Sequence, residues 1–397
     1  MKKGLIILPV LALALTACAS PGAKKDDSQS SVVNVTWESN EADDDSDAIV
    51  IGTTEAKESS EAVASEEAST TVPEEGGEIT LAFCGDMDFD DRYTNMIALR
   101  SRSNGILDCI DSSLVERMRN ADICMVNNEF PYSDRGTPLQ NKKFTFRAKP
   151  ETAEFLNELG VDIVSLANNH AYDYGSDALL DTFDTLTSYN VKYVGAGKNL
   201  AEAMTPQYFS INGNIVSIVA ATQIERSLPP DTVEATETTP GVLRTLDPEK
   251  FVSVISEAKS KSDVCIVFVH WGSENVSEYE ASQKELAQAY VNAGADLIIG
   301  AHPHVLQGIE YINDVPVFYS LGNFWFNSKN LDNCLVEVKI NKNALESLQF
   351  IPCRQHDCKT EEMKKGTTQD YERILADMRE NSAWNVNIDE NGYVSEK

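Results

Sequence analysis

Basic side chains and histidine are both scarce in this 397-residue sequence. Only 33 Lys and Arg stand against 63 Asp and Glu, which gives a formal net charge of −30, and there are five histidines. So acidic a chain repels a phosphate backbone, and the composition argues against nucleic acid as a partner. An anionic ligand would have to be bound by metal ions or by a local group of Arg and Lys side chains.

Long apolar runs are also lacking, because the best candidate, Leu5–Leu15, is too short to span a bilayer. It follows the basic start Met1-Lys2-Lys3, which is typical of a secretory signal peptide, here over residues 1–17. The next segment, Leu15-Thr16-Ala17-Cys18, resembles the bacterial lipobox, in which the cysteine is lipidated after cleavage. We therefore expect an extracytoplasmic protein that Cys18 anchors to the outer face of the cytoplasmic membrane. The alternative is a plain signal peptide that contains a cysteine.

Large apolar residues are few between this signal and residue 78. Residues 21–78 hold sixteen Asp or Glu against three Lys, with many Ser, Thr and Ala. Such a segment buries too little surface to offset its ordering entropy, and its like charges extend it. We expect residues 18–78 to form a lipid-anchored, disordered acidic linker.

Cysteine is present but shows no clear pairing pattern, since seven cysteines remain besides Cys18. Cys353 and Cys358 flank Arg-Gln-His-Asp, which leaves open a disulfide or a small zinc site that uses His356. Three others lie in apolar strand-like runs, where free cysteine behaves as a small buried hydrophobe: Cys84, Cys124 and Cys265.

Strand and helix patterns alternate along the chain from about residue 79. The expected strands at 79–84, 122–126 and 162–166 are separated by expected helices at 107–119 and 150–159. This alternation predicts a parallel sheet with helices on its faces. Asn212-Gly213 and Asn313-Asp314 predict hairpins, and Phe144–Arg147 is a candidate short strand. An α/β fold with mixed sheets follows, and two sheets packed face to face would accommodate these elements.

Four of the five histidines lie at the ends of three apolar, strand-like segments. The segments are Val161–His170, Asp263–Glu274 and Ala295–His304. In open α/β sheets, binding and catalytic groups collect beyond the carboxyl ends of the strands. One histidine at a strand end is more often structural, but several such elements, each after its own strand, predict one shared site.

Carboxylate and amide groups end further strands in the same way. Gly85-Asp86-Met87-Asp88 follows the first strand, Asn127-Asn128-Glu129 follows the second, and Asn168-Asn169 precedes His170. This mixture of carboxylate, amide and imidazole, with little thiol, suits one or two divalent ions such as Mn, Fe or Zn. It is also the ligand set of two-metal hydrolases that act on phosphoryl groups.

Six motifs then occur in order along the chain: Gly85-Asp86 with Arg92, Asn127–Pro131, Ser165–His170 with Asp173 and Gly175, His270–Glu274, Gly300–His304 and Tyr319–Phe324. Together they resemble the CapA/PgsA family of capsule synthesis proteins, which is associated with making or exporting poly-γ-glutamate. The resemblance covers residues 79–326. Because that family resembles calcineurin-like metallophosphoesterases, it implies a four-layer αββα sandwich of two mixed β-sheets flanked by helices. Residues 327–397 would add C-terminal strands that complete a sheet and a polar helical tail.

The resemblance also implies a role for the motif residues. His170 would contact phosphate or act as an acid–base imidazole. Two positions depart from the phosphoesterase pattern, which has histidine where this chain has Asp88 and aspartate where it has Glu129. Asp88 could replace the missing ligand, or one metal position could be weak or empty. The implied metal ligands are Asp86, Glu129, Asn169, His270, His302 and His304. The implied substrate-contacting or supporting residues are Asp88, Arg92, Asn168, Glu274 and Asn323.

Several functions fit these residues. The first is a metal-dependent hydrolase or transferase that acts on a phosphorylated or polyanionic substrate, either in capsule synthesis or as a general extracellular phosphoesterase. The second is a non-catalytic accessory subunit that binds an anionic polymer beside membrane synthase subunits. The third is a structural domain without metal. Arg92, Arg147 and Lys149 could meet an anionic substrate, or they could be solvated or ion-paired.

Overall fold

The computed structural model describes residues 76–225 and 232–397. The expected signal peptide, the lipidation site Cys18 and nearly all of the expected linker lie outside the described residues. Within the two described ranges, no helix combines the length and the apolar character that crossing a membrane requires.

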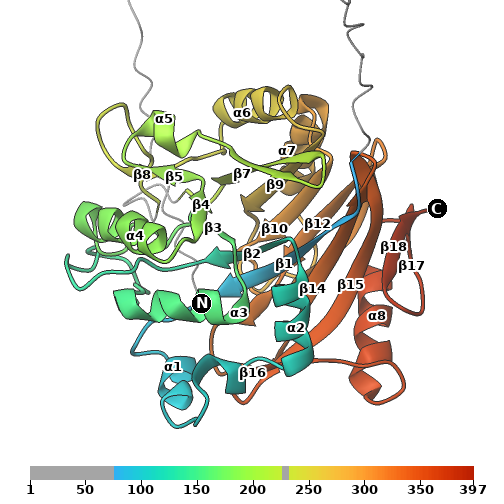
Figure 1. Ribbon diagram of the computed structural model, residues 1–397, viewed down its shortest axis with the longest axis horizontal. Coiled ribbons are helices and arrows are strands. Elements are labelled where there is room, and N and C mark those ends of the chain that lie inside the picture. The colour runs from blue at the N-terminus through green and yellow to red at the C-terminus, as the bar shows by residue number, and fades with distance from the viewer. Residues whose placement is uncertain (1–75, 226–231) are drawn as a thin grey trace, which may run out of the picture. The chain divides into compact units, whose positions relative to one another are not determined.

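The first sheet has ten strands and is mixed (Figure 1). Strands β1 to β4 are parallel neighbours, whereas β14 runs antiparallel to β1, and β15 antiparallel to β14. The strands of this sheet are β1 (Ile79–Met87), β2 (Ile123–Asn128), β3 (Ile163–Ser165), β4 (Lys192–Val194), β13 (Asn323–Trp325), β14 (Leu331–Asn341), β15 (Ala344–His356), β16 (Lys359–Glu362), β17 (Val386–Ile388) and β18 (Tyr393–Glu396).

The second sheet has six strands in the order β11-β12-β10-β9-β7-β6. Its centre, from β7 through β9 and β10 to β12, is parallel, and both edges are hairpins. The hairpins turn at the two predicted places, where Asn212, Asn313 and Asp314 adopt positive φ angles. The strands are β6 (Gln207–Ile211), β7 (Asn214–Thr222), β9 (Val264–His270), β10 (Leu297–Ala301), β11 (Leu306–Ile312) and β12 (Val315–Leu321). A separate small pair joins β5 (Ala196–Gly197) and β8 (Gly241–Val242).

Alternate side chains of the central strands point into different cores. In β1, Leu81 and Phe83 belong to a core shared with β9 and β10, whereas Ala82 belongs to a core shared with helices. In β9, Phe268 joins the shared core and Val267 faces the opposite side. Because strand side chains alternate between the two faces of a sheet, the two sheets pack face to face over the shared core.

Helices cover the outer face of each sheet. Leu114 of α2, Leu156 of α3 and Leu179 of α4 pack on the first sheet, and Phe251 of α6 and Leu286 of α7 pack on the second. The predicted fold, two mixed sheets flanked by helices in four layers, is therefore confirmed. The helices are α1 (Thr94–Leu99), α2 (Ser112–Asn120), α3 (Glu154–Leu159), α4 (Ser176–Ser188), α5 (Leu200–Ala203), α6 (Glu249–Lys259), α7 (Ala281–Ala293) and α8 (Gln369–Asn381), with 3-10 helices η1 (Gly105–Asp108) and η2 (Pro150–Ala153).

Helix α8 departs from the simple four-layer scheme. Its buried residues Tyr371, Ile374, Leu375 and Met378 belong to the core between the sheets. The helix therefore closes one side of that core, next to β11 and β15. Its apolar positions recur at intervals of three and four, so a helix that looks polar in composition presents one apolar stripe.

Two expected elements differ in the structure. The helix expected at 107–119 is divided, because Asp111 accepts a hydrogen bond from the Ser113 backbone N–H at 3.0 Å and starts α2 there. Phe144–Arg147 is not a strand, and it instead forms part of a loop next to the site. Cys353 and Cys358 are both free and buried, so the structure has no disulfide between them. His356 contacts Glu361 at 2.9 Å, and neither group of potential metal ligands found among the described residues includes it.

Candidate metal centre

The polar ends of strands from both sheets meet at one place. Asp86 lies near the end of β1, Glu129 follows β2, and Asn169 follows β3. From the second sheet, His270 is the last residue of β9, and His302 and His304 follow β10 directly. All six side chains predicted as metal ligands therefore gather at the carboxyl ends of parallel strands, where open α/β folds bind ligands.

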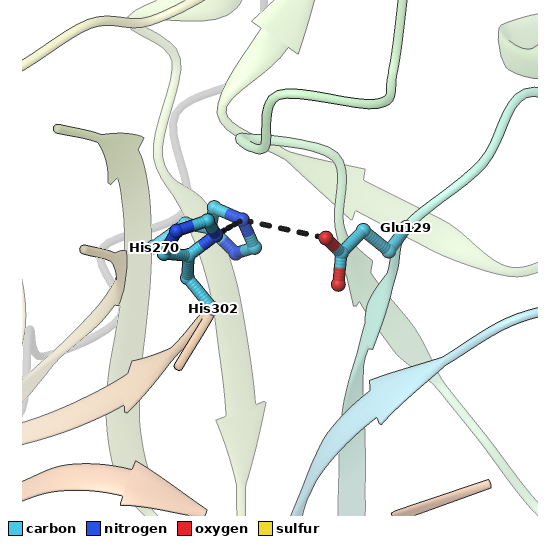
Figure 2. Close-up of side chains that lie close together, drawn as sticks. All are labelled: Glu129, His270 and His302. Carbon is cyan, nitrogen blue, oxygen red and sulfur yellow. Dashed lines mark hydrogen bonds and ion pairs between the residues drawn. The ribbon is translucent and has the colours of Figure 1, made fainter. Parts of the chain in front are cut away.

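The first group of potential ligands consists of Glu129, His270 and His302, all buried (Figure 2). Figure 2 shows the Glu129 carboxylate pointing toward the two imidazole rings. Glu129 Oε1 lies 3.6 Å from His270 Nε2, and His302 Nδ1 lies 3.0 Å from the same nitrogen. Asn169 Oδ1 is 2.8 Å from His270 Nε2, so the amide joins this group.

The second group consists of Asp86, Glu129 and His304. Asp86 Oδ2 lies 3.1 Å from His304 Nδ1, and Glu129 Oε1 lies 3.9 Å from His304 Nε2. Asn323 Oδ1 also contacts His304 Nδ1, at 2.8 Å. Glu129 is common to both groups, so its carboxylate would serve whichever group held an ion.

Two backbone features hold these ligands in place. A Cβ at Gly85 would lie 1.9 Å from the carbonyl oxygen of Gly322, so only glycine permits this approach of β1 to the start of β13. The next residue, Asp86, donates its backbone N–H to that same carbonyl at 3.0 Å. His302 and His304 have φ angles of 99° and 61°, and non-glycine residues in this strained region concentrate at functional sites.

Burial opposes charge at this site when no cation is present. Burial, reinforced by the charges of Asp86 and Asp88, raises the pKa of Glu129 well above its ordinary value. Burial likewise lowers the pKa of His270 well below its ordinary value. For His304, burial lowers the pKa, but the hydrogen bond and charge of Asp86 outweigh it and raise the pKa overall.

The residues present fit a divalent cation. Glu129 Oε1 is buried and has no hydrogen-bond partner among the described residues, although an unsatisfied buried carboxylate oxygen is costly. The contacts given above join donor atoms 2.8 to 3.9 Å apart, and within each group of three all ligand atoms lie within 4.8 Å of one another. Ligands at bond lengths near 2.1 Å around a tetrahedral ion would be roughly 3.4 Å apart, within that range. The buried His, Glu and Asp groups can therefore hold a metal ion.

His170 lies at the edge of this centre and is held by Asp173. The imidazole Nδ1 is 2.7 Å from Asp173 Oδ2, and Nε2 is 3.9 Å from Glu129 Oε1. Asp173 also accepts hydrogen bonds from the Phe146 backbone N–H at 2.7 Å and from Lys142 Nζ at 2.6 Å. An ionised carboxylate only accepts hydrogen bonds, so Nδ1 of His170 must carry the proton that it donates to Asp173. Nε2 of the neutral ring then faces the centre as an acceptor. Burial lowers the pKa of His170, which favours this neutral form.

A family model described as "Bacterial capsule synthesis protein PGA_cap" matches residues 80–328 of this chain. The chain belongs to this family. It is 31% identical over 315 residues to the PGA biosynthesis protein CapA of Bacillus subtilis (strain 168), an alignment that spans 78% of this chain and 80% of that protein. It is 32% identical over 247 residues to the capsule biosynthesis protein CapA of Bacillus anthracis, across 59% of this chain and 58% of that one.

Among solved structures, a 5'-nucleotidase from Candida albicans SC5314 is similar with a TM-score of 0.38 at 11% identity. The match covers 70% of this chain and 52% of the nucleotidase.

The residues predicted to contact substrate or to support the site belong to neither ligand group of this PGA_cap family member. Asp88 accepts the Asp90 backbone N–H at 2.7 Å, its other carboxylate oxygen has no hydrogen-bond partner among the described residues, and it belongs to neither group. Arg92 forms an ion pair with Asp90 at 2.7 Å and donates to the Thr145 carbonyl at 2.5 Å.

Asn168 and Glu274 both lie near Asn169. Asn168 Oδ1 accepts the His170 backbone N–H at 3.0 Å, and its amide donates to the Asn128 carbonyl at 2.9 Å, so it fixes the turn that presents Asn169. Glu274 is exposed and lines a cavity together with Asn169 and His170.

Two supporting residues were not assigned roles from the sequence. Asn127 Nδ2 donates to Asp86 Oδ1 at 2.7 Å and is 3.3 Å from Glu129 Oε2, so one amide orients two ligands. Asp173 orients the His170 ring through its 2.7 Å contact with Nδ1. Both residues belong to recognised motifs, and the spacing of three between His170 and Asp173 was the available signal. Nothing in the sequence pointed to Asn127 as the link between neighbouring strands.

Proposed function

We propose that this chain is an extracytoplasmic lipoprotein that uses a divalent metal centre in the synthesis or export of poly-γ-glutamate. Membership of the PGA_cap family and the names of the two Bacillus relatives support the capsule role. The basic start, the apolar run and the lipobox-like Leu15–Cys18 support attachment at Cys18 to the outer face of the cytoplasmic membrane. Membrane synthase subunits of a capsule complex would then be its neighbours.

The observation that carries the proposed centre is the buried Glu129 Oε1, shared by both ligand groups and lacking a hydrogen-bond partner among the described residues. One or two ions would be held by Asp86, Glu129, Asn169, His270, His302 and His304. Nitrogen and oxygen donors without thiolate favour Mn, Fe or Zn. Divalent ions bound there would act as Lewis acids toward a phosphoryl or carbonyl oxygen of an anionic or phosphorylated substrate.

The pairing of His170 with Asp173 favours a catalytic role over passive polymer binding. Nε2 of His170 faces the centre as an acceptor, while Asp173 fixes the ring and would stabilise its protonated form. An arrangement of this kind can take a proton from a nucleophile or return one to a leaving group. We therefore favour a hydrolase or transferase over a non-catalytic accessory subunit.

Metal analysis of the purified full-length protein tests this proposal. His302→Ala and Asp86→Ala should each lose bound metal, whereas His356→Ala should keep it, because the fifth histidine contacts Glu361 and Asp357 away from the centre. Equal metal content in all three variants would refute the ligand assignment. The same samples are then incubated with phosphodiesters and with poly-γ-glutamate. Bound metal without turnover of either substrate would favour the accessory role.

A further inference from the structure

The hairpin that joins β15 to β16 carries a cysteine in an unusual backbone conformation. Asp357 and Cys358 form its turn between the paired residues His356 and Lys359, and their φ angles are 48° and 56°. A two-residue turn with positive φ at both positions normally contains glycine, asparagine or aspartate. Cysteine in this region carries a steric cost that glycine avoids, and such strain concentrates at functional positions. Cys358 is also only 7% exposed, so it packs against protein although it lies at the tip of a hairpin.

Cys353, which the sequence allows as a partner, lies too far from Cys358 to pair with it. The strand from Cys353 to His356 covers three residue steps, about 10 Å at the usual rise of a β-strand. Cys358 lies farther on, whereas the Cα atoms of a disulfide are usually less than about 7 Å apart. Cys109 is the other cysteine among the described residues that lies outside a strand. The remaining four thiols lie within strands: Cys84, Cys124, Cys265 and Cys334.

Cys109 follows η1 and lies next to this hairpin. The Thr360 backbone N–H donates to the Cys109 carbonyl at 2.8 Å, so Cys109 is hydrogen-bonded two residues from Cys358. Arg102 links the same two segments, because its Nη1 donates to the Asp108 carbonyl at 3.3 Å and to the Cys358 carbonyl at 2.9 Å. Both backbone segments are therefore fixed side by side without any covalent bond between them.

The Arg102 guanidinium also acts on both thiols. Burial raises the pKa of Cys109 to about 11 and raises the pKa of Cys358, and the Arg102 charge opposes this rise at each thiol. A cation beside a thiol favours the thiolate, which is the form that attacks a disulfide. Cys109 is fully buried, so the more exposed Cys358 is the thiol that meets an oxidant first.

We propose that Cys109 and Cys358 form a disulfide in an oxidising compartment, a modification that goes beyond the proposed function and shares with it only the extracytoplasmic location. The oxidant is a disulfide, RSSR, of the surrounding thiol pool. The Cys358 thiolate attacks one sulfur of RSSR and releases RS⁻, and the Cys109 thiolate then displaces the second RS⁻ and closes the bond. Each cysteine gives up one proton and one electron, and RSSR is reduced to two RSH. The closed loop contains every proposed metal ligand except Asp86.

The test compares oxidised and reduced full-length protein. One sample is incubated with oxidised glutathione at pH 8.5, where more thiolate is present, and a second with dithiothreitol. Free thiols are then alkylated under denaturing conditions, and the peptides are analysed by mass spectrometry without reduction. The oxidised sample should contain one peptide pair linked through Cys109 and Cys358. Its unfolding temperature should exceed that of the reduced sample by roughly 5 to 10 °C, because the bond closes a long loop in a large domain.

Cys358→Gly is the most informative variant, because glycine accepts the positive φ of the turn. In dithiothreitol it should unfold at the same temperature as the wild type or at a higher one, and oxidation should no longer raise that temperature. Cys109→Ala should lose the effect of oxidation in the same way. Cys265→Ala is the matched control, since it removes a buried thiol from β9 in the second sheet and should keep the effect.

Three results would overturn the proposal. The first is a bond from Cys358 to any other cysteine, and the second is recovery of both Cys109 and Cys358 as alkylated thiols from the oxidised sample. The third is an equal rise of unfolding temperature on oxidation in the wild type and in Cys358→Gly. Metal does not enter these measurements, so this proposal and the proposed metal centre can fail independently.

Discussion

Glu129 Oε1 lies 3.6 Å from His270 Nε2, and neither side chain is exposed to solvent. The two residues are 141 positions apart and come from different sheets. Without a cation between them, this is a carboxylate whose burial opposes ionisation facing a nitrogen whose burial opposes protonation. A cation bound between them would make both groups ligands. The Glu129 carboxylate should therefore destabilise the protein without metal and stabilise it with metal.

Glu129→Gln tests this reversal. In chelator at pH 8, the variant should be more stable than the wild type by on the order of 1 kcal/mol, because it removes a buried charge that is not hydrogen-bonded at Oε1. With metal at about one hundred times its Kd, the wild type should gain about 2.7 kcal/mol and the variant much less. Urea unfolding with and without metal measures both effects, with Glu257→Gln on the exposed surface as the control. A variant destabilised equally in both conditions would contradict this account.

Asp173→Ala should destabilise the protein by about 3 kcal/mol, because it removes the carboxylate that faces the nearly buried Lys142 ammonium and the His170 ring. Metal content should be unchanged, since Asp173 belongs to neither ligand group. Asp181→Ala is the matched control: its pair with Arg135 is more exposed and should be worth less than about 1 kcal/mol. Urea unfolding and metal analysis on both variants give the comparison, and loss of metal in Asp173→Ala would mean that Asp173 supports the ligands directly.

Gly85→Ala should cost about 1 to 3 kcal/mol and also weaken metal binding. The added Cβ would collide with the Gly322 carbonyl and separate β1 from β13, where Asp86 and Asn323 are paired in register. Gly77→Ala is the control, because a Cβ there meets its nearest neighbour at an ordinary 3.6 Å. Thermal unfolding and a metal titration report the two effects. Equal unfolding temperatures and equal metal affinities in the two variants would show that the close approach of β1 to Gly322 tolerates an added methyl group.

His356 provides a pH test away from the centre. Its hydrogen bond to Glu361 raises the pKa of the imidazole above the ordinary 6.5. A raised folded-state pKa gives stability that is fully present below the unfolded pKa and is lost as the pH rises through the folded value. His356→Ala should therefore lower stability slightly at pH 5.5 and not at pH 8.5, the effect being small because the pair is partly exposed. Urea unfolding at both pH values checks this, and a larger loss at pH 8.5 would contradict the assigned sign.

Much of the fold follows from local pattern. Strands β1, β2 and β3 lie close to the predicted ranges 79–84, 122–126 and 162–166, and Asn-Gly and Asn-Asp place both hairpins. Other elements depend on distant contacts. Phe144–Arg147 is apolar enough to resemble a strand, but Asp173 and Asp90 take its backbone N–H groups, so no neighbouring strand pairs with it. Helix α8 is polar in composition, and only the gap between the sheets explains its buried face.

The sequence by itself determined which groups could form the site, because polar residues after apolar strands are recognisable within each short segment. Only the tertiary structure decided which of these groups lie close together in each ligand group. It placed Glu129 in both ligand groups, left Asp88 outside them, and brought His304 to Asp86 across 218 positions of chain. Those distances depend on how two sheets pack over one core. No single segment carries that information, since each strand fixes only the direction of its own side chains.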